Sequence, residues 1–284
     1  MPESSVVSAW ELGLRLRERR DHLALSVASV AKAVKMQQPN LSAVETGRKK
    51  LTVANLAKLA KLYELGLDEL AELKELQVQA DQRDWYHSYT WLFSEEFVRY
   101  LGLESGAARI STFQCALIPG LLQTENYAKA VIRGGSPYIR LTEVDPRAEV
   151  RIARQRRLEG ANPLRVTALI GEAVLRQQVG GPEVMRGQLE SLTRFATEKA
   201  HIDIRVLPYS AGAHPVLGGP FDVISFDSPR LPDMVWQETL TSTALLDRQQ
   251  LVREHTVAFE EAVNTALSVD DSLEFIRDIA KEMM

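Results

Sequence analysis

Two short helical patterns joined by a tight turn, in residues 26–47, constrain this chain more than any other feature of its sequence. The first pattern begins at Ser26, a residue type that caps helices, and continues as an apolar stripe at helical spacing. That stripe consists of Val27, Val30, Ala31 and Val34. The second pattern has Pro39 in its first turn, where the missing N–H costs nothing, and ends at Gly47. Short helix, tight turn, helix and glycine stop together form the helix-turn-helix arrangement.

Three further helical patterns flank this pair, so residues 9–77 predict five short helices. One face of the first helix carries Leu12, Leu16 and Arg20. Thr52 caps the fourth helix. The inward face of that helix carries Leu56, Leu59, Ala60 and Tyr63. The fifth pattern, LDELAELKELQVQ, leads the chain out of this region. We therefore expect an all-α, five-helix domain over residues 1–80.

The second helix of such a motif presents the side chains of its N-terminal end to base edges in the DNA major groove. Amide side chains stand at that end, and amides can pair with adenine through both a donor and an acceptor. Cations just beyond the helix, and its own N–H groups, suit the flanking phosphates. The predicted DNA-binding residues are Ser26, Gln37, Gln38, Asn40, Ser42, Thr46, Arg48, Lys49 and Lys50.

Charge is distributed unevenly along the chain. Residues 1–66 contain eleven Lys and Arg against six Asp and Glu, although the whole chain has a net charge of −4. A basic segment on an acidic remainder favours a polyanionic partner for the basic segment alone. With the helix-turn-helix pattern, this predicts a regulator of transcription that binds double-stranded DNA. The alternative is a helical bundle that never contacts DNA.

The stretch RERRDHLALSVASVAKAVKMQQPNLSAVETGRKK resembles the helix-turn-helix of phage-repressor regulators of the Cro and Xre type. The matching residues are Arg20, Leu25, Val30, Ala31, Gln38, Leu41, Ser42, Val44, Glu45 and Gly47. The resemblance implies a buried salt bridge between Arg20 and Glu45. Two residues depart from the family pattern. Val27 replaces a glutamine that commonly contacts phosphate, and Lys35 replaces a glycine, so a non-glycine residue needs positive φ at about 1 kcal/mol.

Beyond residue 108 the sequence changes to mixed helical and strand patterns. The expected strands are RISTFQCALI, LRVTALIGEAVL, IDIRVLPYS, GPFDVISFDS and DMVWQETL, with TSTALL as a further short one. Capped or amphipathic helices alternate with them. The aromatic segment 85–100 reads as a helix that docks this region. We expect α+β architecture overall, with a mixed α/β domain over residues 81–284 that has a small sheet and flanking helices.

Several long segments of residues 85–284 are similar, in the same order, to the C-terminal domain of antitoxin-like, WhiJ-like regulators of actinomycetes. They include IPGLLQTENYAKAVIRG, VDPRAEVRIARQRRL and IRVLPYSAGAHPVLGGPFDVISF. The resemblance implies an actinomycete transcriptional regulator that acts with a small acidic partner protein encoded nearby. Two other roles for this domain stay open: sensing a small molecule, or catalysis.

Nothing in the sequence favours catalysis. The five histidines are dispersed, and the HExxH, GxSxG and paired-cysteine patterns are absent. We expect no catalytic residue, no cofactor and no metal. Glu172 and Glu238 each end an apolar strand and could meet across a sheet. The Gly180–Gly181 pair before a helix is a weak anion-binding signal, and the lone cysteine, Cys115, reads as a small buried hydrophobe.

The sequence also yields expectations about location and assembly. The lack of an apolar run of about 18 residues argues against a membrane span, and the lack of a signal segment and of paired cysteines fits the cytoplasm, near the nucleoid. We expect a homodimer held mainly by residues beyond 80. The expected surfaces are the aromatic segment 85–100 and the closing helices in 247–282, through Phe259, Val263, Phe275 and Ile279.

Overall fold

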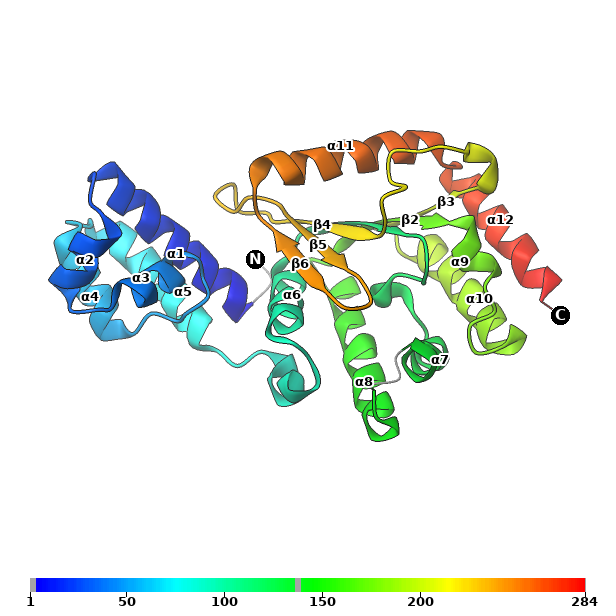
Figure 1. The fold of residues 1–284 in the computed structure, drawn as a ribbon, viewed down its shortest axis with the longest axis horizontal. Helices are drawn as coiled ribbons and strands as arrows, with labels where there is room; N and C mark the ends of the chain where they lie inside the picture. The colour runs from blue at the N-terminus through cyan, green and yellow to red at the C-terminus, as the bar shows by residue number, and fades with distance from the viewer. Residues whose placement is uncertain (1–3, 136–138, 284) are drawn as a thin grey trace. The chain divides into compact units, whose positions relative to one another are not determined.

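A computed structural model describes residues 4–135 and 139–283 of the chain. The chain divides into two compact units (Figure 1). The first unit comprises the chain up to His87 together with Ser228–Leu231, and the second comprises Ser88–Asp227 and the chain from Pro232 onward. The helical N-terminal part and the mixed C-terminal part confirm the α+β architecture expected from the sequence. The helices in the described parts of the chain are too short or too polar to cross a membrane.

The first unit contains the five expected helices. They are α1 (Ser5–His22), α2 (Val27–Val34), α3 (Gln38–Glu45), α4 (Val53–Leu62) and α5 (Leu67–Asp81). Side-chain caps begin three of them: Ser4 accepts the N–H of Val7 at 3.3 Å, Ser26 accepts that of Ser29 at 3.1 Å, and Thr52 accepts that of Asn55 at 3.3 Å. These caps occupy N–H groups that the first turn leaves unpaired, so they fix where α1, α2 and α4 start.

A single hydrophobic core joins the five helices of the first unit. Its buried members are Leu12, Leu16, Val30, Ala31, Val34, Leu41, Val44, Leu51, Leu56, Leu59, Tyr63, Leu73 and Leu76. Every helix contributes to it. Short helices such as α2 and α3 are unstable alone in water, so this shared core is what holds them helical and in place.

Residues with positive φ make the tight turns of the first unit. Lys35 ends α2 at φ 58°, which confirms the left-handed conformation expected there. Gly47 follows α3 at φ 66°, and a β-carbon at this position would lie 2.5 Å from the α-carbon of Trp10. Only glycine satisfies both conditions without displacing α1.

A six-stranded mixed sheet organises the second unit, in the order β3-β2-β1-β4-β5-β6. The strands are β1 (Arg109–Gln114), β2 (Arg165–Gly171), β3 (Ile202–Leu207), β4 (Phe221–Ser225), β5 (Met234–Glu238) and β6 (Thr243–Leu246). Strands β1, β2 and β3 are parallel, and β4, β5 and β6 continue the sheet in antiparallel pairs. All six correspond to expected strands.

Helices cover both faces of this sheet. They are α6 (Glu95–Gly106), α7 (Glu125–Gly135), α8 (Val144–Arg154), α9 (Glu172–Arg176), α10 (Pro182–Glu198), α11 (Gln249–Thr265) and α12 (Val269–Glu282). In Figure 1, α11 crosses one face, whereas α6 and α8 lie on the other. Between α11 and the sheet, Phe113, Phe221 and Phe259 belong to one buried cluster. Short 3-10 helices link the elements: η1 (Trp85–Leu92), η2 (Gly120–Leu122), η3 (Leu141–Glu143), η4 (Gln155–Leu158) and η5 (Tyr209–Ala211).

Three local expectations were wrong. Residues 85–100 do not form one helix, because Ser94 caps α6 and separates it from η1. The stretch LRVTALIGEAVL is not a strand throughout, since β2 ends at Gly171 and α9 begins at Glu172. Cys115 is exposed because it lies one residue beyond β1. Partial burial still raises the pKa of its thiol, which disfavours the reactive thiolate.

The apolar stripes expected to form a dimer interface are largely used by the core. Phe259 and Ile279 are 5% and 2% exposed. Val263 packs against the cluster beneath α11, and the Arg176 guanidinium lies 5.8 Å from the Phe275 ring centre. A sheet with two apolar faces needs both of them covered. The closing helices supply part of that cover, so these side chains are not a free surface.

Candidate nucleic-acid interface

Helix α3 has a buried face and an open face. Leu41, Val44 and Glu45 point inward, with exposures of 0%, 2% and 5%. The predicted reading residues lie on the outer side: Gln37, Gln38 and Ser42 are exposed, and Asn40 is half-buried. Because the inner face is locked in the core, the orientation of the outer face is fixed by the rest of the unit.

The two amides at the start of α3 are available for a partner. Gln37 occupies the cap position, with extended backbone, and its side chain makes no capping hydrogen bond. Neither Gln37 nor Gln38 has a side-chain hydrogen bond to another residue of the described chain. An exposed amide without an internal partner keeps its donor and acceptor for a base edge.

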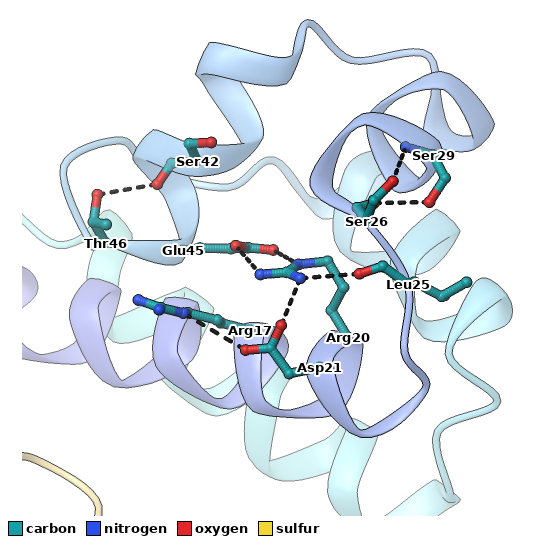
Figure 2. A network of polar contacts seen from close by, with 9 residues as sticks. All are labelled: Arg17, Arg20, Asp21, Leu25, Ser26, Ser29, Ser42, Glu45 and Thr46. Atoms are coloured by element: carbon teal, nitrogen blue, oxygen red, sulfur yellow. Dashed lines mark hydrogen bonds and ion pairs between the residues drawn. The ribbon is translucent and has the colours of Figure 1, made fainter.

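An ion pair between α1 and α3 holds the back of this helix (Figure 2). Arg20 Nε donates to Glu45 Oε1 at 2.7 Å, and Nη2 donates to Oε2 at 2.9 Å. Both side chains are buried. The bidentate arrangement is the strongest geometry of an arginine–carboxylate pair. The structure therefore contains the salt bridge that the sequence resemblance implies.

Two further contacts complete the Arg20 network, and sequence reasoning missed both. Nη1 of Arg20 donates to Asp21 Oδ1 at 2.6 Å and to the Leu25 carbonyl at 3.0 Å. The Leu25 bond ties the network to the residue before the cap of α2, so one guanidinium positions both helices of the motif (Figure 2). The adjacent acid was a signal in the sequence, whereas the carbonyl contact is visible only in three dimensions.

The electrostatics of this network keep Arg20 and the neighbouring Tyr63 each in a single charge state. Hydrogen bonding to Glu45 raises the pKa of Arg20 more than burial lowers it. Burial raises the pKa of the neighbouring Tyr63 phenol well above its usual value, and the negative charge of Glu45 raises it further. Arg20 thus stays charged and Tyr63 neutral throughout the physiological range. The network has no titrating switch in these two groups.

Some of the other predicted DNA-binding side chains form hydrogen bonds within the protein, and others do not. Lys49 Nζ donates to Asn40 Oδ1 at 2.9 Å, and Thr46 Oγ1 donates to the Ser42 carbonyl at 3.0 Å. Arg48 and Lys50 are exposed, and their side chains form no ion pair or hydrogen bond with described residues.

At the other end of the motif, the side-chain oxygen of Ser26 is engaged as the cap of α2 but remains exposed. Val27, which replaces the glutamine of the family pattern, packs against the core. Position 27 therefore offers no polar side chain to a phosphate. The exposed hydroxyls of Ser26 and Ser29 and the N–H groups at the start of α2 are polar groups that this end still presents.

The second unit does not assemble the carboxylate pair that the sequence allowed. Strands β1 and β4 lie between β2 and β5, so Glu172 and Glu238 are kept apart. Glu172 instead accepts hydrogen bonds from Arg176 Nε at 2.7 Å and from the Tyr209 N–H at 2.8 Å. No group of three or more His, Cys, Asp and Glu in residues 4–135 and 139–283 is placed to hold a metal ion.

Comparison with known proteins finds one family model in the N-terminal part of the chain and another in the C-terminal part. Residues 11–73 match the family model described as a helix-turn-helix domain, and residues 97–278 match the one described as a domain of unknown function, DUF5753. No curated protein and no solved structure matches the chain. The N-terminal match points to a DNA-binding regulator rather than an enzyme. Because the DUF5753 match spans more than half of the chain, the protein belongs to the DUF5753 family and carries a helix-turn-helix domain in front of that domain.

Proposed function

We propose that this protein is a sequence-specific transcriptional regulator that reads DNA with the N-terminal end of α3. One observation carries the proposal: α3 presents two unengaged amides, Gln37 and Gln38, on an open face while its opposite face is locked into the core. A reader of base edges needs such rigid placement, because bidentate base pairing tolerates little displacement.

In this proposal the predicted residues divide by task. Gln37, Gln38 and Asn40 meet base edges in the major groove. Arg48, Lys49 and Lys50, with Ser26, Ser42 and Thr46, hold phosphates or flank the contact. Since Lys49 donates to the Asn40 amide oxygen, the amide of Asn40 is oriented before DNA arrives. The cation and the amide then act as a pair.

The first prediction tests base reading. Gln38→Ala should weaken binding to the cognate site by about 1–3 kcal/mol and relax the preference at one base position. Binding to random duplex DNA should change little, because a glutamine adds nothing to the phosphate attraction. Titrations of both DNAs by fluorescence anisotropy measure the two effects. Gln82→Ala, an exposed glutamine just beyond α5, is the matched control. Equal losses on cognate and random DNA would contradict base reading by Gln38.

The second prediction tests phosphate holding. Replacing Arg48 and Lys50 together by alanine should weaken all sequences alike. The slope of log K against log salt should fall by roughly 0.9 for each lost phosphate contact. Lys49 is left intact because it contacts Asn40. Lys74→Ala, an exposed lysine of α5, serves as control. An unchanged slope in the double variant would show that Arg48 and Lys50 point away from DNA.

We further propose that residues 1–80 bind DNA and that residues 81–284 carry the dimer contact and receive a partner. A homodimer is supported by the shortness of α3, which reaches few base pairs, whereas regulators of this type use two half-sites about 10 base pairs apart. The small acidic partner protein and an actinomycete source rest on the sequence resemblance alone. A pull-down with the product of the neighbouring gene tests the partner, and failure to retain it would remove that part.

A further inference from the structure

The six-stranded sheet of the second unit ends at β3 on one side and at β6 on the other, and the structure treats these two edges differently (Figure 1). At the β3 edge, residues at the start of α12 supply hydrogen-bond partners. The Leu267 N–H donates to the Val206 carbonyl at 2.9 Å, and the Val206 N–H donates to Ser272 Oγ at 2.9 Å. At the other edge, β6 pairs with β5 alone among the strands of the described chain.

The hydrogen bonds of the β5–β6 hairpin show which backbone groups of β6 face outward. The Thr239 N–H donates to the Ser242 carbonyl at 2.8 Å across a two-residue turn. Successive residues of an antiparallel strand alternate between bonding to the neighbouring strand and facing away from it. The N–H and C=O groups of Thr243 and Leu245 therefore face away from β5. They form no hydrogen bond with another residue of the described chain.

This open edge lacks the features by which proteins usually protect an exposed strand. Charged side chains, prolines and bulges normally interrupt such edges. The stretch TLTSTALL, residues 239–246, contains no charged residue, no proline and no glycine. The residues of β6 are half-buried, and Leu240 in the turn before it is 86% exposed. The β6 edge is therefore able to accept another strand.

Charge and symmetry favour a second copy of this chain as the source of that strand. Beyond residue 66 the chain is acidic as a whole, so two copies repel each other. The uncharged edge is a place where they can approach without opposing like charges. The edge is also complementary to itself, because its outward groups repeat every second residue and an antiparallel copy presents the same spacing.

We propose that two copies of this protein pair through β6 in an antiparallel arrangement, with a two-fold axis beside Ala244. In this register Thr243 lies opposite Leu245 of the partner subunit, and each such pair exchanges both N–H···O bonds. Leu240 lies opposite Arg248 of the partner subunit. The backbone of Arg248 is extended, so the exposed leucine gains an aliphatic neighbour from the stem of that side chain. The inference rests on the proposed homodimer and names its contact.

Disulfide formation between two full-length chains tests the register. The two Ala244 positions form a non-hydrogen-bonded pair with Cα atoms about 4.5 Å apart, a separation that a disulfide can bridge. In a Cys115→Ser background, Ala244→Cys should therefore give a covalently linked dimer under mild oxidation. Leu240→Cys in the same background is the matched control. Position 240 is the more exposed of the two, but its two copies lie roughly 27 Å apart in this register and should not link.

Sedimentation of the full chain at several concentrations, without DNA, measures the strength of the contact. Thr243→Pro removes an outward N–H at the first position of β6, where a proline leaves the ladder to β5 intact. It should weaken dimerisation at least about tenfold, because each copy loses a backbone hydrogen bond. Thr243→Ala keeps that N–H and should change the affinity less than about twofold. Hydrogen exchange in β5 shows whether the proline variant is folded, and the cysteine variants decide if it is not.

The outcomes separate this contact from DNA reading. A monomeric full chain would overturn the pairing, as would equal cross-linking through Ala244→Cys and Leu240→Cys. A folded Thr243→Pro variant that dimerises as tightly as Thr243→Ala would overturn it too. A chain that stays monomeric until an extended peptide is added would assign the edge to that partner instead. The effect of Gln38→Ala on cognate and random DNA is measured independently, so base reading by α3 stands or fails without this contact.

Discussion

Replacing Glu45 by alanine should lower the free energy of unfolding of the first unit by about 3–5 kcal/mol, because it leaves Arg20 buried without its carboxylate. The lost bidentate pair links α1 to the back of α3 inside the protein. We expect the amides of α2 and α3 to lose protection most, since Arg20 also holds the Leu25 carbonyl ahead of α2. DNA binding should fall as the recognition helix loses its fixed orientation.

Hydrogen exchange followed by mass spectrometry measures this loss separately in each unit, which a single melting curve of a two-unit chain does not. Glu72→Ala is the matched control. It breaks the 2.7 Å ion pair of Arg15 with Glu72, whose carboxylate side chain is 62% exposed, and should cost less than about 1 kcal/mol. If Glu45→Ala and Glu72→Ala cost the same, the Arg20–Glu45 pair does not hold the motif together.

Gly13→Ala should also lower the free energy of unfolding of the first unit substantially, although it adds only one methyl group. A β-carbon at Gly13 would lie 2.0 Å from the Val44 carbonyl oxygen and 3.0 Å from its carbon. Both neighbours are backbone atoms of α3, so relief requires α1 and α3 to move apart. Overpacking of this kind typically costs about 1–3 kcal/mol and occasionally more. The backbone contact places this substitution at or above the upper end of that range.

Urea titration of the hydrogen-exchange protection in α1 and α3 measures the effect of Gly13→Ala. Gly66→Ala is the matched control, because a β-carbon there meets no atom within 4 Å and its φ is −65°. The Gly13 variant should also bind DNA more weakly, since α3 is displaced. Equal protection in the two variants would mean that α1 and α3 adjust without cost.

The sequence predicted the first unit well because local signals and the global fold agree there. Ser26, Thr52 and the apolar stripes fix where α2 and α4 begin and which way they face. The positive φ of Lys35 was expected from the resemblance, because the family pattern commonly has a glycine at this position. Gly13 was missed because a glycine inside a helical pattern does not reveal what backbone lies against it.

In the second unit, the sequence predicted the strands better than it predicted whether the apolar stripes of the closing helices belong to the core or to an interface. Alternating and continuous runs of apolar residues identified all six strands. They could not show that Phe259 and Ile279 are buried where the closing helices cover the sheet. Glu172 and Glu238 could not be separated without the strand order.

Selection of bound duplexes from a random DNA library by the full chain tests the central claim most directly. If α3 reads base edges as proposed, the selected sequences should converge on one motif with two related half-sites about 10 base pairs apart. Methylation protection should then place the contacts in the major groove of each half-site. A selected pool no different from the starting library, with equal affinity for every duplex, would contradict sequence-specific DNA reading by this protein.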